Sequence, residues 1–148
     1  MSYTNLNYHI VFGTKDRRPS IEAELLPRMT KYLGGIIREL DGCMIEANGP
    51  EDHLHIVAAI GPKLAISDFL RTIKTNSSKW VHDTYAGKGD FGWQDGYSAF
   101  SVSHSQLSAV VEYVRGQQAH HQKMTFEQEL IALLKRHEIK FDPKYVVA

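Results

Sequence analysis

The stretch at residues 51–60 constrains the fold more than any other part of the sequence. It consists mostly of small and β-branched apolar residues and follows Asn-Gly-Pro at 48–50, so it is expected to form a β-strand after a tight turn. Side chains of a strand alternate between two faces. One face is then apolar throughout, while the other carries the imidazoles of His53 and His55. The chain is predicted to build a sheet with one face packed on helices and a histidine pair on the opposite face.

The histidine pair has two interpretations. Two histidines at positions i and i+2 can both reach one metal ion, and imidazole is a common metal ligand. The same spacing also suits two solvated polar side chains on a half-exposed strand. The strand pattern alone leaves both interpretations open.

The hydrophobic periodicity predicts the other elements. Apolar residues that alternate with polar ones predict further strands at 5–12, 43–47 and 93–101. Apolar residues at helical spacing predict helices at 21–40, 65–85, 105–118 and 125–137. The last of these helices opens on Thr125 with Gln128 three residues later, which is the sequence signature of a capping box.

The order of elements is β-α-β-β-α-β followed by two helices. This order predicts an α+β fold of the ferredoxin-like type, with an antiparallel sheet, helices on one face and two additional C-terminal helices. The first and third strands of that topology are neighbours at the sheet centre. The open face of the sheet would then carry His53 and His55, and His9 on the first strand either lies beside them or has a packing role.

Composition limits the class of protein. The 148 residues are 43% apolar and 23% charged, as expected for one globular domain that spans 1–148. The single cysteine, Cys43, excludes an internal disulfide and fits a reducing cytoplasm. Neither a signal-peptide core nor an apolar run of membrane-spanning length is present. We therefore expect a cytoplasmic protein without a membrane partner.

The charge distribution suggests two candidate contacts with DNA. Seventeen basic and seventeen acidic residues give a net charge of zero, so binding to nucleic acid cannot be argued from overall charge. Basic residues nevertheless gather in one loop and along one predicted helix. The candidate DNA-binding residues in these two groups are Lys15, Arg17, Arg18, Arg71, Lys74 and Lys79. A solvated surface explains both groups equally well.

A second candidate feature lies in the predicted helix at 105–118. Tyr113 and Gln117 are four residues apart, so in a helix they lie one above the other on the same face. They could present a phenolic oxygen and an amide oxygen to one point. A tyrosine at the edge of the apolar stripe is the alternative.

Four blocks of sequence together resemble the single-tyrosine transposases of the HUH (histidine-hydrophobe-histidine) class, the small transposases of IS200-type insertion sequences. In chain order the blocks are 8–15 (YHIVFGTK), 17–19 (RRP), 52–55 (DHLH) and 113–121 (YVRGQQAHH). The histidine motif alone is a weak pattern. All four blocks in this order, in a chain this short, are specific and extend over most of the sequence.

The resemblance implies a DNA transposase that cuts and rejoins single-stranded DNA at element ends. Tyr113 would be the nucleophile and would form a 5′-phosphotyrosine intermediate with a free 3′-OH. His53, His55 and Gln117 would hold a divalent cation, Mg²⁺ or Mn²⁺. The implied partners are single-stranded DNA with hairpin-forming ends and a second copy of the chain. In such a homodimer the tyrosine helix of one protomer completes the metal site of the other, in trans.

The chemistry suits these residue types. A divalent cation neutralises a scissile phosphodiester and stabilises its leaving oxygen, and two imidazoles with an amide oxygen add no negative charge that would weaken its pull. A phenol with a pKa near 10 is a weak nucleophile at neutral pH, and the sequence does not identify its base. Residues that could orient a ligand or handle a proton are Asp52, His9, His120 and His121. Each of them also has a structural or solvated interpretation.

Three other functions compete with this one. The chain could be a domesticated HUH single-strand nuclease that no longer moves an element. It could be a non-catalytic single-stranded DNA-binding module that stacks bases on Tyr8, Trp93 and Tyr97, although the latter two also suit a core or an interface. A plain metal-dependent phosphoesterase would need an acidic ligand cluster that the sequence does not display.

Overall fold

The computed structural model describes residues 1–120 and 123–146, except for the side chain of His120. The strands of the described chain are β1 (Asn7–Gly13), β2 (Cys43–Asn48), β3 (His53–Ala59) and β4 (Ser98–Val102). Its α-helices are α1 (Leu25–Glu39), α2 (Ile66–Thr84), α3 (Leu107–Arg115), α4 (Gln117–His120) and α5 (Phe126–Arg136). Two short 3₁₀ turns lie at Lys15–Arg17 and His104–Gln106.

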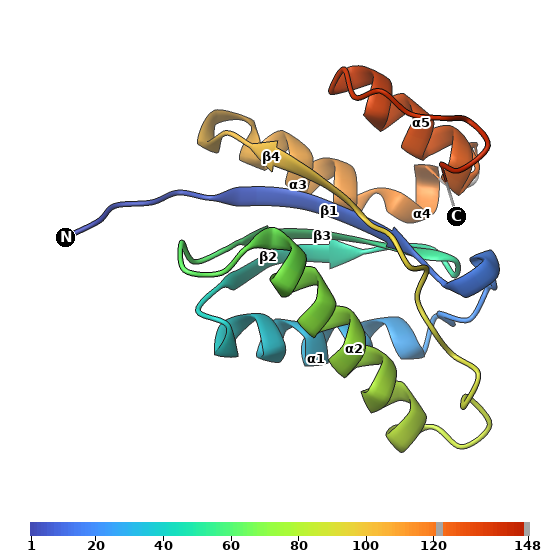
Figure 1. Ribbon diagram of the computed structural model, residues 1–148. Coiled ribbons are helices and arrows are strands. Elements are labelled where there is room, and N and C mark those ends of the chain that lie inside the picture. Colours follow the sequence, from blue (N-terminus) through green and yellow to red (C-terminus); the bar gives the residue numbers. More distant parts are fainter. Residues whose placement is uncertain (121–122, 147–148) are drawn as a thin grey trace.

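The strands form one antiparallel sheet in the order β2-β3-β1-β4. The first and third strands are therefore central neighbours, as the ferredoxin-like topology predicts (Figure 1). His55 lies opposite Val11, and His9 lies opposite Val57. His9 and His55 are thus diagonal neighbours on the same face of adjacent strands.

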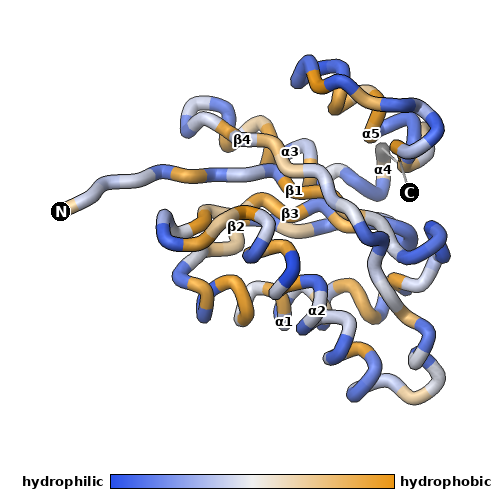
Figure 2. The backbone as a smooth tube through the Cα atoms, viewed as in Figure 1, coloured by the Kyte–Doolittle hydropathy of each residue, from blue (hydrophilic) through white to orange (hydrophobic). Residues whose placement is uncertain are grey.

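Helices cover both faces of this sheet (Figure 1). On one face α1 and α2 pack on the apolar residues of the central strands, which follow the predicted alternation; the largest fully buried residues of this core include Ile10, Phe12, Leu54, Ile56, Met29, Leu33, Ile37, Phe69, Leu70 and Ile73. The other face carries α3, α4 and α5. A second apolar cluster lies between the sheet and α5 and consists of Val11, Phe100, Phe126, Leu130, Leu133 and Leu134. Figure 2 shows the apolar segments of β1 and β3 between the two helical layers.

The sequence predicted that the face of the sheet carrying the histidines is open. This prediction is wrong, because α5 covers that face. His53 and His55 lie on the expected face, yet both are fully buried. Val11 and Phe100 give that face an apolar patch on which the apolar stripe of α5 packs. The pattern predicted the α5 helix but not the surface on which it docks.

The helix predicted at 105–118 is interrupted at Gly116, which ends α3. The side chain of Asn48, on β2, donates hydrogen bonds to the carbonyls of Val114 (3.1 Å) and Arg115 (3.0 Å). These carbonyls belong to the last turn of α3, where no intrahelical donor is available. Tyr113 and Gln117 consequently lie on two successive helices rather than on one helix face.

The other predictions hold with small shifts at the ends. The capping box at Thr125 and Gln128 is present and starts α5 at Phe126. β4 begins at Ser98 rather than at 93, because Lys74 ties the preceding loop to α2 through the carbonyls of residues 94, 95 and 96. Among the helices of residues 1–120 and 123–146, none is both long and apolar enough to span a lipid bilayer.

Candidate active site

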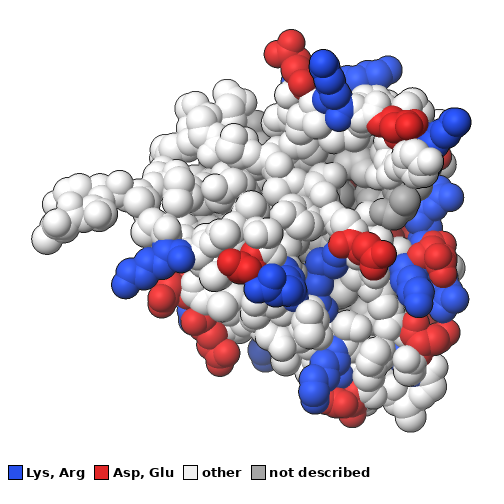
Figure 3. Space-filling model, in the orientation of Figure 1, with Lys and Arg blue, Asp and Glu red and all other residues white. Residues whose placement is uncertain are grey.

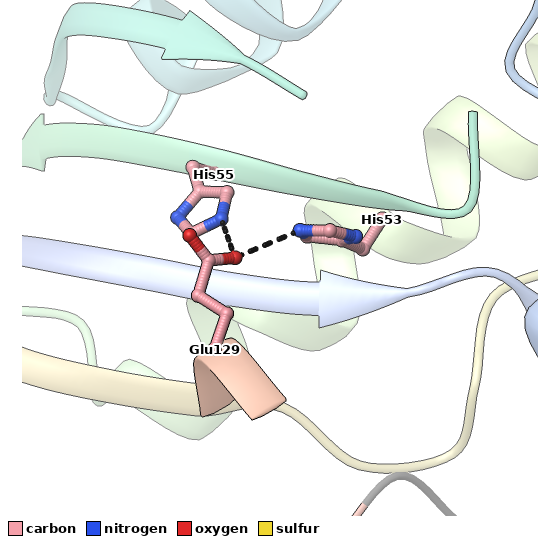
Figure 4. Close-up of side chains that lie close together, drawn as sticks. All are labelled: His53, His55 and Glu129. Atoms are coloured by element: carbon pink, nitrogen blue, oxygen red, sulfur yellow. Dashed lines mark hydrogen bonds and ion pairs between the residues drawn. The ribbon is translucent and has the colours of Figure 1, made fainter. Parts of the chain in front are cut away.

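Three potential metal ligands converge beneath α5. His53 and His55 project from β3, and Glu129 projects from α5 toward them (Figure 4). Oε1 of Glu129 lies 3.0 Å from Nε2 of His53 and 2.9 Å from Nε2 of His55. The donor atoms of the three residues all lie within 4.8 Å of one another, and all three side chains are buried. The cluster is compatible with a divalent metal site.

The spacing of these donors fits a metal ion. In six-coordinate geometry with ligands about 2.1 Å from the ion, neighbouring ligand atoms lie about 3.0 Å apart. Both Nε2–Oε1 distances have this value. Two imidazoles with a carboxylate are a donor set that first-row divalent ions accept readily.

Both histidine rings are held by partners on their Nδ1 side. Nδ1 of His53 donates to Oδ1 of Asp52 at 2.8 Å, and Nδ1 of His55 lies 2.8 Å from Nε2 of His9. The rings of His9 and His55 also stack, with centroids 5.1 Å apart. Such outer partners fix the ring orientation and the tautomer. The Nε2 atoms of both rings therefore face Glu129.

The pKa values of His9 and His53 are shifted in opposite directions. Burial lowers the pKa of His9 to about 3, and the charge of His55 adds to this effect, so His9 is a neutral ring at physiological pH. Burial also acts to lower the pKa of His53, but the hydrogen bonds to Asp52 and Glu129 outweigh it and raise that pKa above its usual value. Acidic partners on both nitrogens thus favour a positive charge at His53, whether from a proton or from a cation.

Tyr113 and Gln117 meet on the second oxygen of the same carboxylate. The phenolic hydroxyl of Tyr113 and the amide nitrogen of Gln117 (3.1 Å) both donate to Oε2 of Glu129. Burial and the bond to Glu129 raise the pKa of Tyr113, so its hydroxyl is protonated at neutral pH. The predicted nucleophile and the predicted ligand therefore lie next to the histidine pair within one chain. For Gln117 to bind a cation, its amide oxygen would have to face the site in place of the nitrogen.

The two predicted DNA-binding groups lie on different sides of the molecule. Lys15, Arg17 and Arg18 are exposed beside the site, where Arg17 is 3.9 Å from Glu127 of α5 and Arg18 is 3.4 Å from Asp90. This loop borders a cavity of about 710 Å³ that Arg17, Asp52 and Phe126 help to line.

The second basic group lies on α2, on the sheet face opposite the histidines (Figure 1). Arg71 pairs with Asp68 at 2.6 Å and Lys79 with Asp83 at 2.8 Å. The Lys74 ammonium is half-buried and donates to three loop carbonyls, so it has a structural role in this fold. Basic and acidic side chains are intermixed on the surface seen in Figure 3.

Other candidate residues are not brought to the site. The His120 side chain and His121 lie outside the described residues. Trp93 is buried in the core and its indole donates to Ser77, which removes it as a stacking platform, whereas Tyr97 is partly exposed. Tyr8 packs against the main core.

Glu129 is the site residue that the sequence did not single out. Its position offered one signal: it falls on the apolar stripe of α5, between Phe126 and Leu130, where a carboxylate must be buried. Burial of a charged group requires partners. A carboxylate at a core position of an amphipathic helix was therefore a pointer to a buried polar site that the motifs did not reveal.

Comparisons with a family model and with individual proteins all identify transposases. The family model for IS200-like transposases matches residues 2–117. The transposase of insertion sequence IS200 from Salmonella typhimurium is 28% identical over 125 residues, covering 76% of this chain and 77% of the relative. The ISDra2 transposase TnpA from Deinococcus radiodurans is 23% identical over 117 residues, covering 76% and 84%.

Two solved structures share the fold. A crystal structure described as that of a transposase from Deinococcus radiodurans R1 superposes with a TM-score of 0.63 at 20% identity, covering 78% of this chain and 93% of the other. A REP-associated tyrosine transposase bound to a REP hairpin superposes with a TM-score of 0.61 at 13% identity, covering 82% and 72%. The order of strands, the histidine motif and the family match over residues 2–117 lead to one conclusion: this chain belongs to the family of IS200-like transposases.

Proposed function

We propose that this protein cuts and rejoins single-stranded DNA through a covalent bond to Tyr113, with the help of a divalent cation. One observation carries the proposal: the Tyr113 hydroxyl and the Nε2 atoms of His53 and His55 all contact one carboxylate. The tyrosine and the histidine pair are thus close enough to act on a single phosphate, as the proposed nucleophile and the proposed cation ligands. Membership of a transposase family, which implies cleavage and transfer of DNA strands, supports the same chemistry.

His53 and His55 would hold the cation, Mg²⁺ or Mn²⁺, with Gln117 as a further ligand once its amide is turned. When bound, the ion would neutralise the scissile phosphate and stabilise the departing oxygen. Asp52 and His9 position the two rings through their hydrogen bonds to Nδ1.

The hydroxyl oxygen of Tyr113 would attack the phosphorus, and the bond from phosphorus to the 3′ oxygen would break. Tyr113 gives up its hydroxyl proton and the departing 3′ oxygen takes one up, so one proton passes overall from the phenol to the free 3′-hydroxyl. The downstream strand stays on Tyr113 through its 5′-phosphate. Because the phosphodiester is exchanged for another phosphodiester, a later attack by a 3′-OH can rejoin strands without ATP. A cavity of about 640 Å³ lined by Tyr113, His9 and Arg136 gives the strand a route to the nucleophile.

Detection of the covalent intermediate tests this proposal. Single strands that carry the DNA flanking the gene, labelled at the 3′ end, are incubated with the protein and Mn²⁺. A labelled protein adduct is expected, because the downstream fragment retains the label. Tyr113→Phe should abolish it, while Tyr145→Phe, at an exposed tyrosine, should not. An adduct that survives in Tyr113→Phe would contradict the assignment, and absence of an adduct in the parent protein would favour a binding module.

The arrangement in trans across a homodimer stays a prediction of the resemblance. Within one chain, Tyr113 and His55 both contact Glu129, so a site built in cis is the alternative. Tyr113→Phe and His53→Ala proteins, each inactive alone, should recover adduct formation when mixed if the tyrosine acts on the partner's site. Failure to recover under conditions of subunit exchange would establish the cis arrangement.

A further inference from the structure

The helix that carries Glu129 lies beyond the part of the chain that the family model matches. The match ends at residue 117, whereas α5 comprises Phe126–Arg136. Yet α5 inserts a carboxylate between the histidine pair on one side and Tyr113 and Gln117 on the other. The candidate site of this chain thus includes a residue from a helix outside the matched residues.

We propose that Glu129 is a ligand of the divalent cation, so that α5 completes the metal site of its own chain. This inference rests on the proposed function of His53 and His55 as ligands. The 3.0 and 2.9 Å distances from Oε1 to the two Nε2 atoms equal the separation of neighbouring ligands around one ion. The carboxylate also raises the affinity of the site for a hard cation above that of two neutral imidazoles and an amide, at the cost of part of the ion's pull on the phosphate.

The position of Glu129 is built into the fold. Phe126 stacks on the ring of His53, with centroids 4.1 Å apart and planes 13° apart. The absence of a side chain at Gly13 makes this stacking possible, because a Cβ there would lie 2.7 Å from Cε2 of Phe126. The capping box at Thr125 fixes where the helix begins, and Leu130, next to Glu129, packs in the apolar cluster on the sheet. The packing of α5 therefore aims Glu129 at the histidines.

Coupling between cation and helix follows from this geometry. If Glu129 binds the cation only while α5 is docked, each bound ion stabilises the docked helix by mass action, and docking in turn raises the affinity for the ion. The competing role for Glu129 is that of an occupant which must leave before a cation can bind. The two roles predict opposite effects of removing its charge.

The first measurement is the affinity for Mn²⁺ of the full chain without DNA, from titration followed by electron paramagnetic resonance. Glu129→Gln should weaken binding about tenfold or more, because ligand charge is a main determinant of affinity for hard cations. The matched control is Glu127→Gln, on the same helix but half-exposed near Arg17, which should leave affinity unchanged. Unchanged or tighter binding in Glu129→Gln would overturn the proposal, and tighter binding would identify Glu129 as the competing occupant.

A second variant keeps the test decisive if Glu129→Gln loosens the helix for other reasons. Glu129→Asp retains the charge with a shorter reach, so its Mn²⁺ affinity should lie between those of the parent and Glu129→Gln. Mn²⁺ should also slow hydrogen exchange of the α5 amides in the parent and not in Glu129→Gln. Equal slowing in both proteins would overturn the coupling.

Failure of this inference is distinguishable from failure of the proposed function, because neither measurement uses DNA or turnover. If Mn²⁺ binding is lost in His53→Ala but unaffected in Glu129→Gln, the histidine site stands and only the role of Glu129 falls. If His53→Ala binds Mn²⁺ as the parent does, the proposed cation site itself is wrong.

Discussion

The two faces of strand β3 are equally buried but chemically unlike. On β3, Leu54 and Ile56 enter the apolar core beneath α1 and α2, while His53 and His55 enter a polar network beneath α5, and all four are fully buried. Apolar burial needs only close packing, whereas each buried polar group costs free energy unless it is hydrogen-bonded. The network of Asp52, His9, Glu129 and their partners meets that requirement. The first face therefore stabilises the fold, and the second holds the side chains of the candidate site in place.

Substitutions at two neighbouring residues of β1 should show the largest difference in stability between the two faces. Phe12 lies in the core against α1 and α2, and Val11 lies in the cluster under α5. Phe12→Ala should lower the free energy of unfolding by about 3–5 kcal/mol. Val11→Ala removes fewer atoms and should cost about 2 kcal/mol or less. Urea unfolding measures both values.

Hydrogen exchange tests whether the structures packed on the two faces of the sheet unfold independently of each other. Val11→Ala should speed exchange mainly in α5, while Phe12→Ala should speed it throughout the sheet and in α1 and α2, because its core is shared by those elements. Val11→Leu, which keeps an apolar side chain there, is the control for α5 docking. Uniform acceleration in both alanine variants would show that the two faces unfold as one unit.

The sequence predicted the first face far better than the second. Alternation on β1 and β3 and the helical spacing of α1 and α2 are local patterns, and they identified the core residues with element ends shifted by a few residues. The capping box at Thr125 is also local, and it is present. The histidine pair and Tyr113 were visible through their motif.

What escaped prediction depends on contacts between distant segments. The interruption of the helix at Gly116 uses a side chain from β2, that of Asn48. The docking of α5 on Val11 and Phe100, and with it the arrival of Glu129 between the histidines and Tyr113, depends on how the chain returns over the sheet. Periodicity shows which residues are buried, but it does not show against which surface.

Lowering the pH should destabilise the protein through His9, on the sheet face that lies beneath α5. Its pKa is about 3 in the folded protein against about 6.5 when exposed. Between these values the unfolded chain binds more protons, so the neutral ring contributes stability that is present above pH 6.5 and lost as the pH falls toward 3. The slope from this group is about 1.4 kcal/mol per pH unit at most.

Comparison of variants isolates this contribution from that of other groups. His9→Gln, which retains a hydrogen-bonding side chain toward His55, should lose less stability than the parent protein between pH 6.5 and 4.5 in urea unfolding. His53 does not contribute to the loss of stability between pH 6.5 and 4.5. Its pKa is raised in the folded protein, so its contribution to stability is fully present below pH 6.5 and is lost only at higher pH. His104→Gln, at an exposed histidine, is the control. Parallel pH profiles for the parent and His9→Gln would exclude the buried neutral ring.

Exposed cations should distinguish the faces by DNA binding, with the smallest effects on stability. Arg17 borders the cavity beside Asp52 and Phe126, whereas Arg71 lies on α2 on the opposite face. Each phosphate contact to single-stranded DNA contributes about −0.7 to the slope of log K against log salt. Arg17→Ala should reduce the magnitude of the slope by about that amount, and Arg71→Ala should leave it unchanged, as measured by fluorescence anisotropy of a labelled single strand. Both should change the free energy of unfolding by less than about 1 kcal/mol, because their ion pairs are exposed. Equal reductions in slope for Arg17→Ala and Arg71→Ala would mean that the DNA also contacts α2, and not only the side of the molecule that carries the candidate site.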